Sequence, residues 1–138
     1  MKVMVVCSTS FYDKVEDVKV KLESNGHKIV LPNCYGEADA NNKILKEEEY
    51  QAFFAEMFSQ SREKIKDIDA ILVLNYTKEK NGIQLANYIG ASTFLEMYEA
   101  FMNSKKIYMM NGYPDNMLLD EIKGFSPIII NGDLDLVK

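Results

Sequence analysis

The segment NYIGASTFLEMYEA, residues 87–100, combines residue types that could bind and cleave a small molecule. Gly90, Ser92 and Thr93 come shortly before the carboxylate of Glu96, and a polar loop separates all four from an apolar segment upstream. A glycine and two hydroxyls at the start of a helix can surround an anion with N–H and O–H groups. Two interpretations follow. One is ordinary helix capping beside a solvated glutamate, and the other is a nucleotide site that carries a nucleophile.

The elements that must position these residues alternate along the chain. Short apolar runs at 2–7, 28–32, 70–75, 106–111 and 127–131 predict five strands. Helical spacing of apolar residues predicts helices near 15–22, from about Lys43 to Ile65, within the 87–100 segment and over 114–124, whereas 76–89 is predicted to be a polar loop. Such alternation indicates right-handed crossovers and a parallel sheet. We expect a single domain over residues 1–138, an α/β three-layer sandwich with a five-stranded parallel sheet of flavodoxin-like or Rossmann-like order.

Two helices carry large apolar residues whose location matters. In the helix after Gly90, one side is apolar and is predicted to face the core, while Glu96 and Glu99 lie on the other side. That apolar side comprises Phe94, Leu95, Tyr98, Phe101 and Met102. The long helix carries an aromatic stripe, for which we expect a core role rather than an interface role. That stripe comprises Tyr50, Phe53, Phe54 and Phe58.

Composition excludes several classes of protein. The net charge of -5 argues against a surface for nucleic acid, which requires clustered basic residues. No apolar run approaches the roughly 18–20 residues that span a membrane, and the first residues do not resemble a signal peptide, so we expect a cytoplasmic protein. Cys7 and Cys34 are then reduced, and Cys7 is predicted to be buried and non-catalytic. With His27 as the one histidine, no metal site is predicted.

Common motifs for phosphate or acyl chemistry are missing. There is no G-x-G-x-x-G after the first strand, no G-x-x-x-x-G-K-[ST] and no G-x-S-x-G, so no dinucleotide or other cofactor is expected. In open α/β sheets, ligands bind beyond the carboxyl ends of the strands. The segments expected at that edge are rich in hydroxyls, amides and glycines, and they are 8–11, 33–42, 75–93, 111–113 and 131–133.

A resemblance covers most of the chain. IDAILVLNYTKEKNGIQLANYIGASTFLEMYEA, followed by KKIYMMNGYP, resembles the core of the nucleoside 2-deoxyribosyltransferase-like superfamily. That superfamily includes the deoxyribosyltransferases and the 2′-deoxynucleoside 5′-phosphate N-hydrolases. CSTSFYDKVEDVKVKLESNGHKIVLP is similar to its first strand, loop and helix. The likeness is to small members that carry NYIG before the glutamate.

The resemblance implies the role of each candidate residue. Glu96 would attack the anomeric carbon of a deoxyribosyl group and form a covalent intermediate. Ser92 and Thr93, with the backbone at Gly90, would bind a phosphate or sugar hydroxyl, although Ser92 could instead cap the helix. Two further sets of ligands are predicted beyond the first and third strands, and they are Ser8, Thr9 and Ser10, and Asn75.

The sequence also departs from the superfamily pattern. Asn75 and Tyr88 stand where the transferases commonly have aspartates, and no general acid can be placed. Two functions therefore stay open: cleavage or transfer of the N-glycosidic bond of a nucleoside or nucleotide, or non-catalytic nucleotide binding or sensing. The implied partners are that small molecule and other copies of the chain in a homodimer or larger oligomer. In such an assembly, residues 131–138 would complete a neighbour's cleft.

Overall fold

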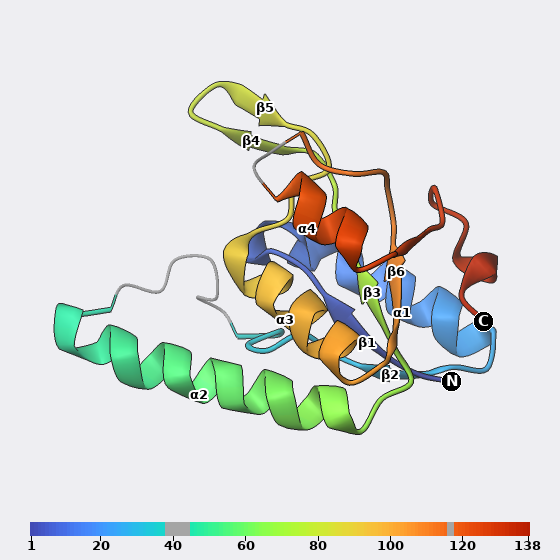
Figure 1. The fold of residues 1–138 in the computed structure, drawn as a ribbon, viewed down its shortest axis with the longest axis horizontal. Coiled ribbons are helices and arrows are strands. Elements are labelled where there is room, and N and C mark those ends of the chain that lie inside the picture. Colours follow the sequence, from blue (N-terminus) through green and yellow to red (C-terminus); the bar gives the residue numbers. More distant parts are fainter. Residues whose placement is uncertain (38–44, 116–117) are drawn as a thin grey trace.

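The computed structural model describes residues 1–37, 45–115 and 118–138. Five parallel strands form the main sheet in the order β2-β1-β3-β6-β7 (Figure 1). They are β1 (Lys2–Val6), β2 (Lys28–Val30), β3 (Ala70–Val73), β6 (Lys106–Met109) and β7 (Ile128–Ile129). The chain runs outward from β1 to β2 and then crosses to β3 and beyond. This is the flavodoxin-like order, so the predicted sheet is confirmed.

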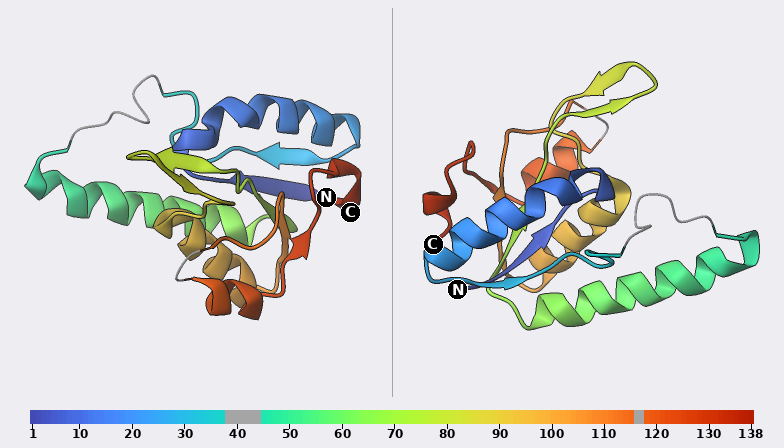
Figure 2. Two further views of the ribbon diagram at one scale, coloured as in Figure 1. Left: turned by 90° about the horizontal axis from the view of Figure 1, so that it is seen from above. Right: turned by 180° about the vertical axis from the view of Figure 1, so that it is seen from behind.

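Helices cover both faces of the sheet, which confirms the three layers (Figure 2). One face carries α1 (Val15–Ser24), entered through the 3-10 turn η1 (Thr9–Lys14), and the C-terminal turn η2 (Leu134–Leu136). The other face carries α2 (Glu47–Lys66), α3 (Ala91–Met102) and α4 (Leu119–Gly124). Each face of the sheet has its own hydrophobic core, and successive residues of a strand point into opposite cores. Val3 and Val5 pack toward α1, whereas Met4 and Val6 pack toward α2 and α3.

Part of the segment predicted as a loop is a β-hairpin. Within residues 76–89, β4 (Lys78–Lys80) and β5 (Ile83–Leu85) pair antiparallel and project beyond the sheet (Figure 1). Asn81 and Gly82 join them with φ angles of 53° and 76°. Positive φ at both central residues defines a type I′ turn, for which Asn-Gly is the favoured pair. The signal was present in the sequence, but the charged strands around it lack apolar alternation.

The predicted core side of α3 is wrong. The residues that α3 buries are Thr93, Met97 and Ala100, which also repeat at helical spacing. Four of the five apolar residues expected in the core are more than two-fifths exposed, and they are Leu95, Tyr98, Phe101 and Met102. Two valid stripes therefore exist on one helix. The narrower stripe faces the sheet because its two apolar residues, Met97 and Ala100, pack against β3 and β6 in the core.

The core role predicted for the aromatic stripe of α2 is also wrong. Tyr50, Phe54 and Phe58 are 45%, 36% and 46% exposed, and the residues that α2 buries are Ser61 and Ile65. A helix of 20 residues is about 30 Å long, whereas strands of four or five residues span about 17 Å. The first turns of α2 therefore extend past the sheet (Figure 2). The expected start at Lys43 lies outside the described residues.

The two ends of the chain meet at the amino edge of the sheet. The Tyr108 hydroxyl donates to the carbonyl of Lys138 at 2.6 Å, and His27 Nε2 lies 3.0 Å from the carbonyl of Val137. This edge is opposite the strand ends at which ligands bind in such folds. A role for residues 131–138 in a neighbouring subunit stays a prediction. Among the described helices, none has both the length and the apolar character needed to cross a bilayer.

Candidate active site

A pocket of about 850 Å³ opens beside the carboxyl end of β1, between η1, α2 and α3. This volume is typical of pockets for small molecules. Four segments line it: the end of β1 with η1, residues 32–37, residues 45–62 in and just before α2, and residues 88–99. β1 and β3 are the strands at which the order of the sheet reverses, so the pocket lies near the switch point.

Glu96 lies in the second turn of α3 and lines this pocket. Its Oε2 atom accepts a hydrogen bond from the Ser61 hydroxyl of α2 at 2.9 Å. Among the described residues, no group donates a hydrogen bond to Oε1. Burial raises the pKa of Glu96 to about 7, although the Ser61 hydrogen bond and the charge of Lys64 both act to lower it.

Ser61 belongs to a longer chain of hydrogen bonds. Asn33 Nδ2 donates to Ser61 Oγ at 2.7 Å and to the carbonyl of Met57 at 3.3 Å. Asn33 Oδ1 accepts from Lys64 Nζ at 2.7 Å. The Tyr12 hydroxyl of η1 donates to the Asn33 carbonyl, which ties the segment after β2 to η1. The carboxylate on α3 is therefore connected through α2 to the loop that follows β2.

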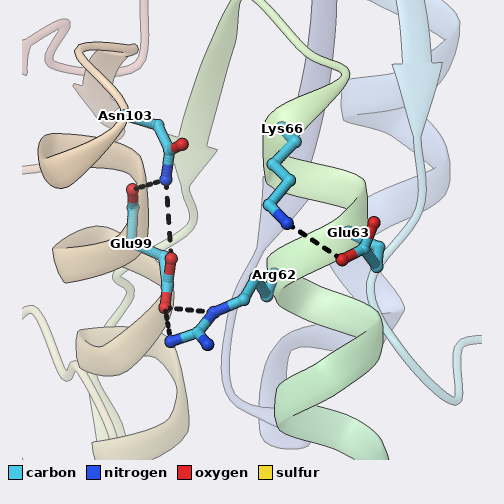
Figure 3. Close-up of polar contacts among 5 residues, drawn as sticks. All are labelled: Arg62, Glu63, Lys66, Glu99 and Asn103. Atoms are coloured by element: carbon cyan, nitrogen blue, oxygen red, sulfur yellow. Dashed lines mark hydrogen bonds and ion pairs between the residues drawn. The ribbon is translucent and has the colours of Figure 1, made fainter.

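An ion pair at the pocket wall holds α2 against α3 (Figure 3). Arg62, the single arginine of the chain, donates from Nε and Nη2 to Glu99 Oε1 at 2.9 and 2.6 Å. Arg62 follows Ser61 directly, and Glu99 lies one turn beyond Glu96. The ion pair therefore fixes the alignment of the two helices in which Ser61 contacts Glu96. Because Arg62 is exposed, we attribute alignment rather than much stability to this pair.

The start of α3 forms another part of the pocket wall. Gly90 is the N-cap and provides no side-chain cap, and the first helical hydrogen bond runs from Phe94 N to the Gly90 carbonyl at 2.9 Å. Ser92 lies inside the first turn, so the alternative in which it caps the helix is wrong. The amides of residues 91–93 have no acceptor within the helix, and their partial positive charge favours an anion there.

The pocket brings together six of the eight residues predicted for the site, and they are Ser8, Thr9, Gly90, Ser92, Thr93 and Glu96. Ser92 is exposed, whereas Thr93 is buried. Ser8 has a second role, because its Oγ accepts from the backbone N–H of Ser10 and caps η1. Ser10 is exposed and does not line the pocket.

Asn75 is fully buried outside the pocket lining. Its Nδ2 donates to the carbonyls of Asn111 and Gly112 at 3.2 and 2.9 Å, and its Oδ1 accepts from the Asn111 N–H at 2.9 Å. These bonds connect the chain after β3 to the chain after β6. Contact of Ser10 or Asn75 with a ligand stays a prediction.

Several pocket residues were not predicted as members of the site. Asn33 lies in a segment expected at the ligand-binding edge. Its position directly after Pro32, where the second strand was predicted to end, was the one feature that could have marked it as a site residue. Ser61 and Arg62 carry no local signal, because a serine and an arginine in a charged helix usually contact solvent. The predicted burial of Cys7 is confirmed, although it also lines the pocket; burial raises its pKa to about 12 and keeps the thiol protonated.

Within residues 1–37, 45–115 and 118–138, no group of three or more His, Cys, Asp or Glu side chains is arranged to hold a metal ion. No protein-family model matches the sequence, and no curated protein sequence is significantly similar to it.

The fold is similar to that of two enzymes of known structure. The CMP N-glycosidase BcmB of Clostridium botulinum has a TM-score of 0.52 and 16% identity, over 95% of this chain and 90% of that chain. The 2-deoxyribosyltransferase of Bacillus psychrosaccharolyticus has a TM-score of 0.53 and 17% identity, over 88% of this chain and 81% of that chain. The resemblance predicted from the sequence is thus confirmed at the level of the fold.

Proposed function

We propose that this protein cleaves or transfers the N-glycosidic bond of a nucleoside or nucleotide, with Glu96 as the nucleophile. The observation that carries the proposal is a partly buried carboxylate held at one oxygen by Ser61 in a pocket of about 850 Å³. The two similar structures support it, because an N-glycosidase and a deoxyribosyltransferase share this fold.

In the proposed reaction, Glu96 Oε1 forms a bond to the anomeric carbon while the carbon–nitrogen bond to the base breaks. The electron pair of that bond leaves with the base, which takes up a proton from solvent or from a neighbouring acid. Water, or a second base in a transfer reaction, then attacks the anomeric carbon, loses a proton to solvent and releases the Glu96 carboxylate. A carboxylate suits this step because its negative charge stabilises the positive charge that develops on the sugar, and its oxygen then bonds to the anomeric carbon.

The pocket supplies groups for the rest of the substrate. The amides and hydroxyls at Ser92 and Thr93, with the backbone of Gly90, would bind a phosphate or a sugar hydroxyl. Ser8 and Thr9 would approach the sugar from the end of β1. Ser10 and Asn75 would act indirectly, since Ser10 bonds to Ser8 and Asn75 joins the loops after β3 and β6.

The experiment that tests the proposal is a base-release assay on a panel of ribo- and deoxyribonucleosides and their 5′-monophosphates. Chromatography is expected to show a free base from at least one member of the panel, with the matching sugar or sugar phosphate in equal amount. A second base added to the mixture distinguishes transfer from hydrolysis. Ligands that stabilise the protein thermally but release no base would contradict catalysis.

One observation favours the alternative of non-catalytic nucleotide binding or sensing. Two further carboxylates, Glu37 and Glu99, line the pocket, and Glu99 is paired with Arg62 and is therefore poorly suited to protonate a leaving base. General acid catalysis typically contributes about 10²–10⁴-fold. Calorimetry on the same panel would then give binding without turnover, and any catalytic turnover would contradict this alternative.

We further propose that two copies associate through the exposed apolar residues around the pocket mouth. Phe54 and Phe58 on α2 and Leu95 and Tyr98 on α3 are exposed and also line the pocket. A second copy would cover this surface and shield the pocket from water. Light scattering is expected to give twice the 15.8 kDa of the chain, and Phe54→Glu is expected to halve that mass. A monomer at every concentration would contradict this arrangement.

A further inference from the structure

Asn33, Ser61 and Lys64 form an ordered set of donors and acceptors behind Glu96. A lysine ammonium has donors only, so the atom of Asn33 that faces Lys64 Nζ must be Oδ1. A backbone carbonyl accepts only, so the atom that faces the Met57 carbonyl must be Nδ2. Two independent partners therefore impose the same orientation on the Asn33 amide.

That orientation determines the direction of the next hydrogen bond. Asn33 Nδ2 donates to Ser61 Oγ, which leaves the single Ser61 O–H free to donate onward. The acceptor at 2.9 Å is Glu96 Oε2. Every donor in the series thus points from Lys64 toward Glu96, and the series ends on a carboxylate that is best stabilised when it is ionised.

We propose that Asn33 and Ser61 are positioning residues, which relay the positive charge of Lys64 to the nucleophile as an oriented hydrogen-bond chain. The chain engages Oε2 of Glu96 and leaves Oε1 to attack. This inference rests on the proposed role of Glu96. It means that residues of α2 and of the loop after β2 orient the Glu96 carboxylate on α3 and favour its ionised form.

Cys7, Tyr12 and Glu99 also lie near Glu96, but none of them supplies a positive charge that would stabilise its ionised carboxylate. Cys7 approaches from the end of β1 and Tyr12 from η1, and burial raises the pKa of each, so both are neutral near pH 7. Glu99, on the next turn of α3, is a like charge that is compensated by Arg62. Lys64 is the cation that acts on Glu96, and it is itself half-buried, with a pKa lowered by that burial.

The test is the titration of the Glu96 side-chain carboxyl carbon by NMR in the free protein, which requires no substrate. Ser61→Ala removes the last donor and is expected to raise the midpoint by about one pH unit. Lys64→Met removes the charge at the start of the chain and is expected to raise it in the same direction. Ser61→Thr keeps the hydroxyl and is expected to restore the wild-type midpoint.

A matched control is Gln60→Ala. Gln60 neighbours Ser61 on α2, but its amide bonds to Glu56 on the same helix and it does not line the pocket. Its variant is expected to titrate like the wild type. In base-release assays, Ser61→Ala is expected to lower kcat at pH 7 about fivefold with KM little changed, because a midpoint of about 8 leaves fewer ionised carboxylates at that pH.

The outcomes separate this relay from a merely structural contact. A loss of thermal stability in Ser61→Ala with an unmoved midpoint would overturn the proposal, as would unmoved midpoints in both Ser61→Ala and Lys64→Met. If Ser61→Ala does not fold, the titration of Lys64→Met decides, and an unmoved midpoint in that variant overturns the proposal. Absence of base release contradicts the proposed function alone, because the carboxyl titration still reports on the relay.

Discussion

Glu96→Gln is expected to reduce base release by on the order of 10⁴-fold or more while leaving the fold intact. The substitution keeps the size of the side chain and an oxygen that can accept the Ser61 hydrogen bond, but an amide cannot form the covalent sugar intermediate. Chromatographic assays on the best substrate of the panel give the rate. Circular dichroism and thermal melting check the fold.

Glu63→Gln is the matched control for this experiment. Glu63 is a carboxylate on α2 that pairs with Lys66 on the outside of the molecule and does not line the pocket (Figure 3). Its variant is expected to retain wild-type activity. Full activity in Glu96→Gln would end the assignment of the nucleophile, whatever the control shows.

Base release by this protein is expected to depend on pH through Glu96. Because burial raises the pKa of Glu96 to about 7, the nucleophile is protonated in acid and ionised in base. We expect kcat/KM to rise about tenfold per pH unit at low pH and to level off above about pH 7. At pH 5 the rate should therefore be about 100-fold below its plateau. His27 contacts the chain termini at the other edge of the sheet, so it is not placed to cause this break.

Protein stability supplies an independent check on the same group. A carboxyl whose folded-state pKa lies above its usual value of 4.5 favours folding most below that value. The contribution is lost as pH rises through about 7, because the folded protein must then hold a partly buried negative charge. Glu96→Gln should accordingly gain roughly 5 °C in Tm relative to wild type between pH 5.5 and pH 8. An equal difference in Tm at the two pH values would contradict a partly buried Glu96 that titrates near pH 7.

Local chemistry in the sequence was enough to predict the sheet and the general place of the site. The apolar runs such as AILVLN could be placed because both faces of a central parallel strand are covered, which requires a nearly continuous apolar sequence. The position of Ser8 and Glu96 near one edge followed from the rule that parallel strands present their carboxyl ends together. The periodicity of apolar residues predicts each element, and the direction of the chain predicts at which edge of the sheet each strand ends. Both can be read from a single segment of the sequence.

The side of a helix that faces the core was decided by the tertiary structure. Met97 and Ala100 lie against the sheet, while Tyr98 and Met102 on the same helix face outward. The sequence could not distinguish these two stripes, because both satisfy helical spacing. The length of α2 decided the exposure of its aromatic residues in the same way. The first turns of this helix extend beyond the sheet, which is too short to cover them.

The sequence by itself determined the strand–helix alternation, the parallel sheet and the candidate carboxylate, because each depends on residues close together in the chain. Only the tertiary structure brought Asn33, Ser61 and Glu96 into contact, since they come from three segments whose relative placement depends on helix packing. The charge state of Glu96 was decided there too. Its burial and its distance from Lys64 are properties of the packed molecule, and no local pattern of residue types encodes them.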